Sequence, residues 1–345
     1  MLPIRTCAGR TALAAVALLC AQPAFGQSVA DFYRGKTVTL LISSGAGGGY
    51  DALARTIANH LGKHVPGSPS VIVKNMVGAG GIVATNYLYN VAAKDGTVVG
   101  GVQNNTPFEP LFGTKEATYD PLKFQWLGTP SIEIAMLTIW HTVPVNSWQD
   151  VRTREITVAS SGLHSTPSFY GRLLNDTLGL KQKIIVGYES QSKAFLAMER
   201  GEVDGYPSVF YNSLMTTRPT WLRDKQVKIL VQMGLEKEPA LPDVPAAMDL
   251  VTSPDDKALM VAAFAPLQSG RPYLLPPGVP ADRVAAMAKA LSDTFRDRDF
   301  LAEAEKRQLG TNSPRSGKEL QELLERVYTK TPQHIVERLR KISTP

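Results

Sequence analysis

The feature that most constrains the fold is a repeated order of elements. A short apolar run rich in β-branched residues is followed by a cluster of small residues and then by a helical pattern. Four such clusters occur, at residues 43–49, 78–81, 160–162 and 190–192. Strands that alternate with helices in this way are typical of α/β proteins with parallel sheets. We therefore expect an α/β fold in which small residues gather where strands end.

This order of elements occurs twice along the chain. Strands are expected at 37–42, 70–74 and 97–102, and again at 156–159, 183–186 and 228–232. We predict a first lobe built from residues 27–138 and 235–345, and a second lobe inserted at 139–234. The chain would cross between the lobes near 130–145 and 228–240, which is the layout of a hinge that closes over a ligand.

The first 26 residues read as a cleaved signal peptide. Arg5 and Arg10 precede an apolar run at 11–20, and small residues at 24 and 26 fit a cleavage site. A membrane anchor is the alternative, but the apolar run is shorter than the roughly 20 residues that span a bilayer. We therefore expect export to the periplasm.

The cysteines narrow the chemistry further. A lipoprotein signal would need a small residue before Cys20, where Leu19 stands. The two cysteines, Cys7 and Cys20, both lie in the expected leader. The exported chain would then have no disulfide, no thiolate metal site and no cysteine nucleophile.

The basic residues are spread thinly. The chain has 37 Lys and Arg against 31 Asp and Glu. The densest basic run, Arg338, Arg340 and Lys341, alternates with apolar residues and is interpreted as a solvated helix face. Nothing resembles a stripe for nucleic acid, so no nucleic-acid partner is expected.

The small-residue clusters predict a site for an anion. Ligands of open α/β sheets bind beyond the carboxyl ends of the strands. A helix that begins there presents unpaired N–H groups, glycine allows close approach of the backbone, and serine adds hydroxyl donors. The alternative is that these clusters only make tight connections. Four clusters in two lobes favour the binding site.

Nucleotide-binding and metal-binding motifs are weak or absent. Residues 47–52 match G-x-G-x-x-A. The dinucleotide fingerprint also requires an acidic residue about 20 positions further on, but none occurs between Asp51 and Asp95. His60 and His64 are four residues apart without an acidic neighbour in the sequence, so we expect them to be solvated. We therefore expect no cofactor and no bound metal.

Catalytic motifs are equally weak. No G-x-S-x-G elbow is present, and residues 190–193 match S-x-x-K without its partner motifs. Ser161 and His164 lie close in the sequence but lack the acid of a triad. We therefore expect a binding protein without catalytic residues. A hydrolase that uses Ser161 and His164 remains the first alternative, and a ligand-binding sensor for a signalling system is the second.

Seven segments in register carry a resemblance to a known family. They lie at residues 32–37, 47–51, 75–81, 93–97, 201–205, 241–245 and 276–280. Together they resemble the receptors of tripartite tricarboxylate transporters, the Bug family, over essentially the whole chain after residue 26. The resemblance implies a two-lobe periplasmic binding protein fold of type II-like architecture with the ligand cleft between the lobes.

The resemblance also implies a function and a site. The protein would capture a small organic acid, either a di- or tricarboxylate or an aromatic carboxylate, and deliver it to integral membrane subunits, and we expect it to be a monomer. Family contacts map onto loops of both lobes, and Asn104 is a further candidate. The predicted ligand-binding residues are Ser43, Ser44, Gly47, Gly48, Gly49, Tyr50, Asp51, Gly78, Ala79, Gly80, Asn104, Ser160, Ser161, Ser165, Ser190 and Asp204.

Two of these residues have more than one interpretation. Tyr50 stands where the family has a small hydroxyl residue, so it would add a ring at the mouth of the cleft and allow an aromatic or bulkier acid. Asp204 would either select an amine of the ligand or cap a turn.

Overall fold

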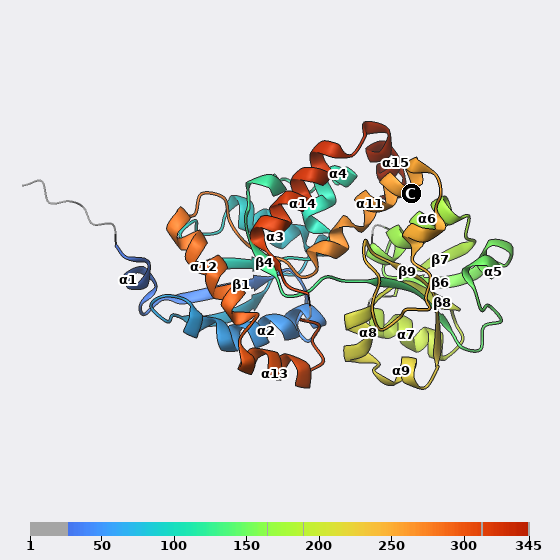
Figure 1. Ribbon diagram of the computed structural model, residues 1–345, viewed down its shortest axis with the longest axis horizontal. Coiled ribbons are helices and arrows are strands. Elements are labelled where there is room, and N and C mark those ends of the chain that lie inside the picture. The colour runs from blue at the N-terminus through green and yellow to red at the C-terminus, as the bar shows by residue number, and fades with distance from the viewer. Residues whose placement is uncertain (1–26, 164, 189, 312, 344–345) are drawn as a thin grey trace, which may run out of the picture.

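The protein folds into two α/β lobes that lie side by side along its long axis (Figure 1). The structure is a computed structural model that describes residues 27–163, 165–188, 190–311 and 313–343. The expected signal peptide at 1–26 lies outside the described residues. The α/β class and the two-lobe architecture are as predicted.

The first lobe is built on a six-stranded sheet in the order β11-β4-β10-β3-β1-β2. Strand β1 pairs in parallel with β2 and β3, whereas β10 and β11 are antiparallel to their neighbours. The strands are β1 (Thr37–Ile42), β2 (Ser70–Asn75), β3 (Val98–Gly101), β4 (Gln125–Thr129), β10 (Tyr273–Leu275) and β11 (Arg315–Ser316).

The second lobe is built on a five-stranded sheet in the order β7-β6-β8-β5-β9. Strand β6 is parallel to β7 and β8, but β5 is antiparallel to both β8 and β9. The strands are β5 (Ala135–Trp140), β6 (Ile156–Ser160), β7 (Gln182–Val186), β8 (Gly205–Phe210) and β9 (Val227–Met233).

Both sheets are mixed, whereas the alternation of strands and helices favoured parallel sheets. Parallel strands follow helical crossovers, whereas β5 enters the second lobe directly from the connection after β4 and runs against β8. Strand β10 likewise enters the first sheet from the connection between the lobes and pairs in the opposite sense.

The chain passes between the sheets twice, from β4 to β5 and again between β9 and β10. The predicted boundary at 138 falls within β5, which pairs in the second sheet along its whole length. The predicted boundary at 234 lies just after β9, and two helices intervene before β10. The division of the chain into lobes at these residues stays a prediction.

Helices cover the sheets and connect the lobes. They are α1 (Val29–Tyr33), α2 (Gly49–Leu61), α3 (Ile82–Asn90), α4 (Glu109–Phe112), α5 (Trp148–Thr153), α6 (Thr166–Leu178), α7 (Gln191–Glu199), α8 (Tyr211–Thr217), α9 (Thr220–Arg223), α10 (Ala247–Leu250), α11 (Pro254–Ser269), α12 (Ala281–Thr294), α13 (Arg298–Lys306), α14 (Gly317–Lys330) and α15 (Gln333–Ser343). A capping box between Ser316 and Glu319 starts α14. No helix of the described residues is both long and apolar enough to cross a bilayer.

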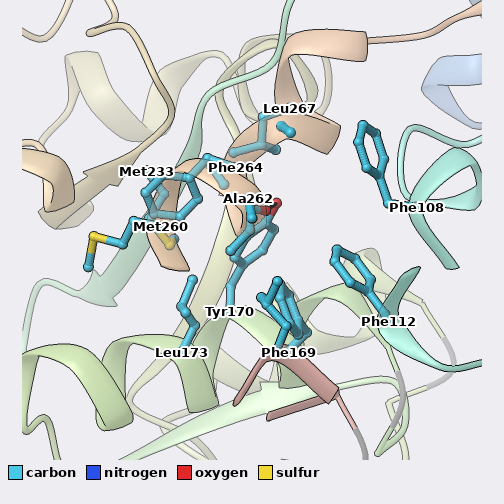
Figure 2. Close-up of a cluster of buried hydrophobic side chains, with 14 of the residues drawn as sticks. Phe108, Phe112, Phe169, Tyr170, Leu173, Met233, Met260, Ala262, Phe264 and Leu267 are labelled. Atoms are coloured by element: carbon cyan, nitrogen blue, oxygen red, sulfur yellow. Dashed lines mark hydrogen bonds between the residues drawn. The ribbon is translucent and has the colours of Figure 1, made fainter. Parts of the chain in front are cut away.

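Helix α11 forms the apolar centre between the lobes. Figure 2 shows a row of aromatic side chains that runs from Phe264 of α11 through Tyr170 and Phe169 of α6 to Phe112 and Phe108 of the first lobe. The Tyr170 hydroxyl donates a hydrogen bond to the carbonyl of residue 263 at 3.2 Å, which fixes α6 against α11.

The basic run of α15 is exposed at Arg340 and Lys341, as expected, but it also contacts other helices. Arg338 forms ion pairs with Asp176 of α6 at 2.6 Å and with Asp256 of α11 at 2.7 Å. Arg340 donates from Nε to the carbonyl of Leu111 at 3.1 Å. The partners of the basic run lie in α4, α6 and α11, so the run joins α15 to elements of both lobes.

Candidate functional site

The first small-residue loop follows β1 and leads into α2. Ser43 is buried, and its Oγ accepts a hydrogen bond from the N–H of Gln103 at 2.9 Å. Gly48 is the N-cap of α2 and has no side chain to cap it. The N–H groups of the first turn of α2 therefore have no side-chain acceptor among the described residues, as an anion site at a helix start requires.

Asp51 shapes this loop from within. Its Oδ2 accepts from the N–H of Gly47 at 2.9 Å, and its Oδ1 accepts from Asn75 Nδ2 at 2.9 Å. Burial would raise the pKa of Asp51, but hydrogen bonds from Arg55, Gly47 and Asn75 outweigh it and hold the pKa below its usual value. The carboxylate is therefore engaged inside the loop.

Tyr50 lies beneath the loop and links three segments. Its hydroxyl accepts from the N–H of Asn104 at 3.3 Å and donates to the carbonyl of Gly270 at 3.3 Å. The guanidinium of Arg271 stands over its ring at 5.3 Å from the centroid. Burial raises the pKa of Tyr50, so the phenol stays protonated. The ring predicted at the cleft mouth is thus half-buried against the connection between the lobes.

The second loop packs on the first. Ala79 and Gly80 are exposed, and both have positive φ angles of 44° and 62°. Gly81 has φ 99°, and a Cβ there would lie 3.1 Å from Ser43 Oγ and 2.9 Å from Thr106. A glycine at this position therefore lets the two loops of the first lobe approach each other.

The serines of the second lobe form a compact hydrogen-bonded cluster. Ser160 Oγ lies 2.7 Å from both Ser165 Oγ and Ser168 Oγ. Ser165 and Ser168 each donate to the carbonyl of Gly162 at 2.7 Å. The cluster holds the turn that precedes α6. Ser165 is the N-cap of α6, but its side chain does not cap the helix, so within the described part of the chain the first N–H groups of α6 lack a side-chain acceptor.

Three further predicted residues take no part in the hydrogen bonds of this cluster. Ser161 is exposed, and Ser190 accepts from the N–H of Lys193 as the N-cap of α7. Asp204 precedes β8, at the opposite end of the sheet from Ser160, and its carboxylate accepts from both the N–H and the hydroxyl of Thr157. The structure therefore does not bring Asp204 together with the serines, and its carboxylate is bonded to β6 rather than to a turn of its own. His164 lies outside the described residues.

A pocket lies between the lobes at the carboxyl ends of β3 and β6. Its volume is about 50 Å³, and it is lined from the first lobe by Asn104, Asn105, Glu109, Phe112 and Thr114, and from the rest of the chain by Thr166, Phe169, Tyr170, Pro266 and Ser343. The pocket therefore joins the loop after β3 to the first turn of α6.

The polar groups of this pocket include one buried donor that has no partner among the described residues. Asn104 is 3% exposed, and its Nδ2 has no hydrogen-bond partner among the described residues. The Glu109 carboxylate accepts from Asn105 Nδ2 at 2.7 Å and from Thr114 Oγ1 at 2.5 Å. A buried amide without a partner is unusual in a folded protein and is a position where a ligand oxygen can be accommodated.

The sequence indicated Asn104 but not the other walls of the pocket. Phe112 and Phe169 stack across the lobes with ring centroids 5.4 Å apart and an interplanar angle of 24°. Thr166 at the start of α6 had a local signal, because Pro167 follows it at a favoured position for a helix start. The aromatic walls had none, since a phenylalanine in a helix is more often simply part of the core.

His60 of α2 and His64, in the turn just after α2, pair with acidic residues rather than with each other. His60 Nε2 lies 2.9 Å from Glu303 Oε2 of α13, and His64 Nε2 lies 2.8 Å from Oδ2 of Asp297, the N-cap of α13. No group of three or more His, Cys, Asp or Glu in the described part of the chain is arranged to hold a metal ion. The expectation that they are solvated was incomplete, because their acidic partners come from a distant helix.

Two mixed β-sheets covered by helices, a chain that crosses twice between them and a pocket between the lobes are the architecture of a two-lobed solute-binding protein. A profile described as the tripartite tricarboxylate transporter family receptor matches residues 53–309, about three quarters of the chain. The protein belongs to this family of solute-binding receptors, which are periplasmic binding proteins and not enzymes.

Solved structures agree with the fold. The periplasmic binding protein BugD is 21% identical to this chain and superposes with a TM-score of 0.64. The match covers 90% of this chain and 99% of BugD. MatC from Rhodopseudomonas palustris with bound malate is 22% identical with a TM-score of 0.65, covering 89% of this chain and 99% of its own. Rpa4515 of R. palustris with adipate is 18% identical with a TM-score of 0.65, covering 89% and 97%.

Proposed function

We propose that this receptor captures a small organic acid, a di- or tricarboxylate or an aromatic carboxylate, in the pocket between its lobes. The observation that carries the proposal is the buried Nδ2 of Asn104, an unpartnered donor that lines the pocket opposite the first turn of α6. The uncapped first turn of α2 supports it from the first lobe, and Ser44 adds a buried Oγ that has no partner among the residues that the structure describes.

The strength of such contacts is sufficient for binding. A micromolar complex requires about 8 kcal/mol, and each hydrogen bond to a charged group contributes roughly 1.5–3 kcal/mol. Three or four N–H and hydroxyl donors to a carboxylate therefore account for most of this affinity. Glu109 opposes an anion at its end of the pocket, so we place the carboxylate toward Asn104 and the two loops of the first lobe.

The size of the pocket indicates that the lobes separate when ligand enters. About 50 Å³ accommodates only a few water molecules. The rings of Phe112 and Phe169 close the pocket from opposite lobes. An acid of four or more carbons therefore requires these rings to move apart, as a hinge between two lobes allows.

The relatives and the resemblance support the wider role. Two similar structures carry malate and adipate, which are both dicarboxylates. Within the proposal, the protein acts in the periplasm after removal of residues 1–26, works as a monomer and delivers its acid to the integral membrane subunits of a tripartite transporter. Neither a cofactor nor a nucleic acid takes part.

A thermal-shift screen with calorimetry tests the proposal. Malate, citrate, adipate, glutamate and benzoate are each added to the wild-type protein, and at least one is expected to raise the melting temperature. Asn104→Ala should weaken binding of that acid, whereas Asn90→Ala, at an exposed position of α3, should not. If no organic acid stabilises the wild type, or if Asn104→Ala binds normally, the proposed site is wrong.

A further inference from the structure

A buried ion pair lies where the two crossings of the chain meet. Glu133 belongs to the connection between β4 and β5, and Arg271 to the connection that leads into β10. Arg271 Nε lies 2.9 Å from Glu133 Oε1, and their side chains are 3% and 0% exposed. Neither residue is among the predicted ligand-binding residues, and neither lines the pocket between the lobes.

The pair is held by backbone contacts between the crossings. The N–H of Arg271 donates to Thr129 Oγ1 at 3.0 Å, and the N–H of Glu133 donates to the carbonyl of Leu267 at 2.9 Å. Asn212 of α8 donates from Nδ2 to Glu133 Oε2 at 3.3 Å. Glu133 therefore receives donors from both the hinge and a helix of the second lobe.

The other face of Arg271 contacts the ligand loop. Its Nη1 donates to the carbonyl of Gly49 at 3.1 Å, and its guanidinium covers the ring of Tyr50. A Cβ at Gly49 would lie 3.4 Å from Arg271 Nη2. Because Gly49 has no side chain, the guanidinium can lie close to the backbone of α2. The first turn of α2 is thereby bonded to the hinge, which is the pair of connections that hold Glu133 and Arg271, and not only to its own lobe.

We propose that the Glu133–Arg271 pair couples the first turn of α2 to the angle between the lobes. Arg271 is a positioning residue, since it acts on the ligand through Gly49 and Tyr50. A buried ion pair is weak evidence for stability, because apolar residues of similar size often serve as well. Charges with fixed hydrogen-bond geometry do, however, specify one arrangement of the groups that they join.

The inference rests on the proposed function, because it gives the α2 loop a role in holding the acid. When the lobes rotate, Glu133 moves with the crossing that it occupies, and the guanidinium transmits that movement to Gly49. Ligand held at the α2 loop then favours the hinge angle at which both Arg271 contacts are made. Loop and hinge therefore form one two-state element, which is what coupling between sites requires.

The test replaces both charges at once. In Glu133→Met/Arg271→Met neither charge is left buried without its partner, so the fold is retained. The matched control is Glu236→Met/Arg315→Met, which removes an exposed ion pair of 2.8 Å that also joins the chain after β9 to the first sheet. Calorimetry with malate, adipate and benzoate should show affinity weakened about tenfold in the first variant, within the range typical of coupling, and unchanged in the control.

A single substitution separates positioning from packing. Arg271→Lys keeps the charge opposite Glu133, but an ammonium cannot make both contacts with the geometry of a guanidinium. We expect it to melt close to the wild type and to lose affinity through faster dissociation. Wild-type affinity in either Arg271→Lys or the double methionine variant, or an equal loss in the control, would overturn the proposal.

A second measurement needs no ligand. With Cys7 and Cys20 replaced by serine, spin labels at Asn90→Cys and Glu202→Cys, both exposed and one in each lobe, report the distance between the lobes. The double methionine variant should broaden the distance distribution, and the control should not. If the wild type binds no acid the proposed function fails, whereas an unbroadened distribution contradicts the coupling on its own.

Discussion

Asn75 donates from Nδ2 to both Asp51 Oδ1 and the carbonyl of Ser44, each at 2.9 Å. The last residue of β2 thus holds the loop after β1 from the side. Because the acceptors belong to both ends of that loop, its shape is determined before any ligand arrives. A preformed loop lowers the ordering cost of binding.

Removing this restraint should loosen the loop. Asp51→Ala takes away the acceptor for Asn75, Arg55 and the N–H of Gly47. Because these donors then lack their partner, we expect the free energy of unfolding to fall by about 1–3 kcal/mol. Urea denaturation measures it, with the exposed Asp243→Ala as control. Equal stability of the two variants would contradict this role of Asp51.

Acid should weaken the packing of α13 on α2. Asp297 caps α13 and contacts Lys63 at 2.7 Å and His64 at 2.8 Å. The hydrogen bond from Lys63, opposed by partial burial, holds the pKa of Asp297 well below its usual value of 3.8. A depressed folded-state pKa gives stability that is present above the unfolded value and is lost as the pH falls below about 3.8.

The measurement compares acid unfolding of the wild type with that of Asp297→Asn by circular dichroism. The variant should be less stable at pH 7, and its stability should fall less steeply below pH 3.8, because it lacks the group that takes up a proton on unfolding. Asp282→Asn, at an exposed position, serves as control. Parallel acid profiles of Asp297→Asn and the wild type would show that Asp297 does not contribute this pH dependence.

The crossing at Gly270 should tolerate no side chain. Its φ is 57°, and a Cβ would lie 1.7 Å from the carbonyl oxygen of Ser131 in the other crossing. Gly201 also has a positive φ of 73°, but nothing lies within 4 Å of its Cβ position. Gly201→Ala is therefore expected to cost roughly 1–2 kcal/mol, the penalty of the left-handed conformation alone.

Gly270→Ala should cost more than about 3 kcal/mol, because the two crossings must also move apart. Thermal unfolding of both variants measures the difference. If both alanines destabilise the protein equally, the close approach of the crossings does not control stability at this position.

Strands with a strong local pattern could be predicted, and short or interrupted ones could not. The expected strand at 37–42 is confirmed as β1, since its β-branched run leads directly into the glycines. Strand β8 contains Pro207, a residue that normally argues against a strand, so its residues show no continuous strand pattern. Strands β10 and β11 have three and two residues and depend on pairing with β4 rather than on their own sequence.

The loops of the candidate site could be located from strand ends, but the side chains that position them could not. Arg271 contacts Gly49 across 222 residues of sequence, and no local pattern records such a contact. The same holds for His60, whose acidic partner Glu303 lies 243 residues away. Spacing along the chain reveals neighbours on one element, whereas these pairs depend on how separate helices pack.

The serine cluster of the second lobe separates a structural from a ligand-binding role. Ser168 is buried, and its Oγ contacts both Ser160 and Gly162 at 2.7 Å, whereas Ser161 next to them is exposed. Ser168→Ala should therefore lower the free energy of unfolding by about 1 kcal/mol, and Ser161→Ala should change it by less than about 0.5 kcal/mol.

If Ser161 touches the acid as predicted, Ser161→Ala should instead weaken binding in calorimetry while leaving the unfolding curve in place. A change in stability without a change in affinity would assign Ser161 to the structure of the turn. The two variants thus distinguish a hydroxyl that stabilises the start of α6 from one that binds a ligand. The hydrogen bonds within the cluster do not make this distinction by themselves.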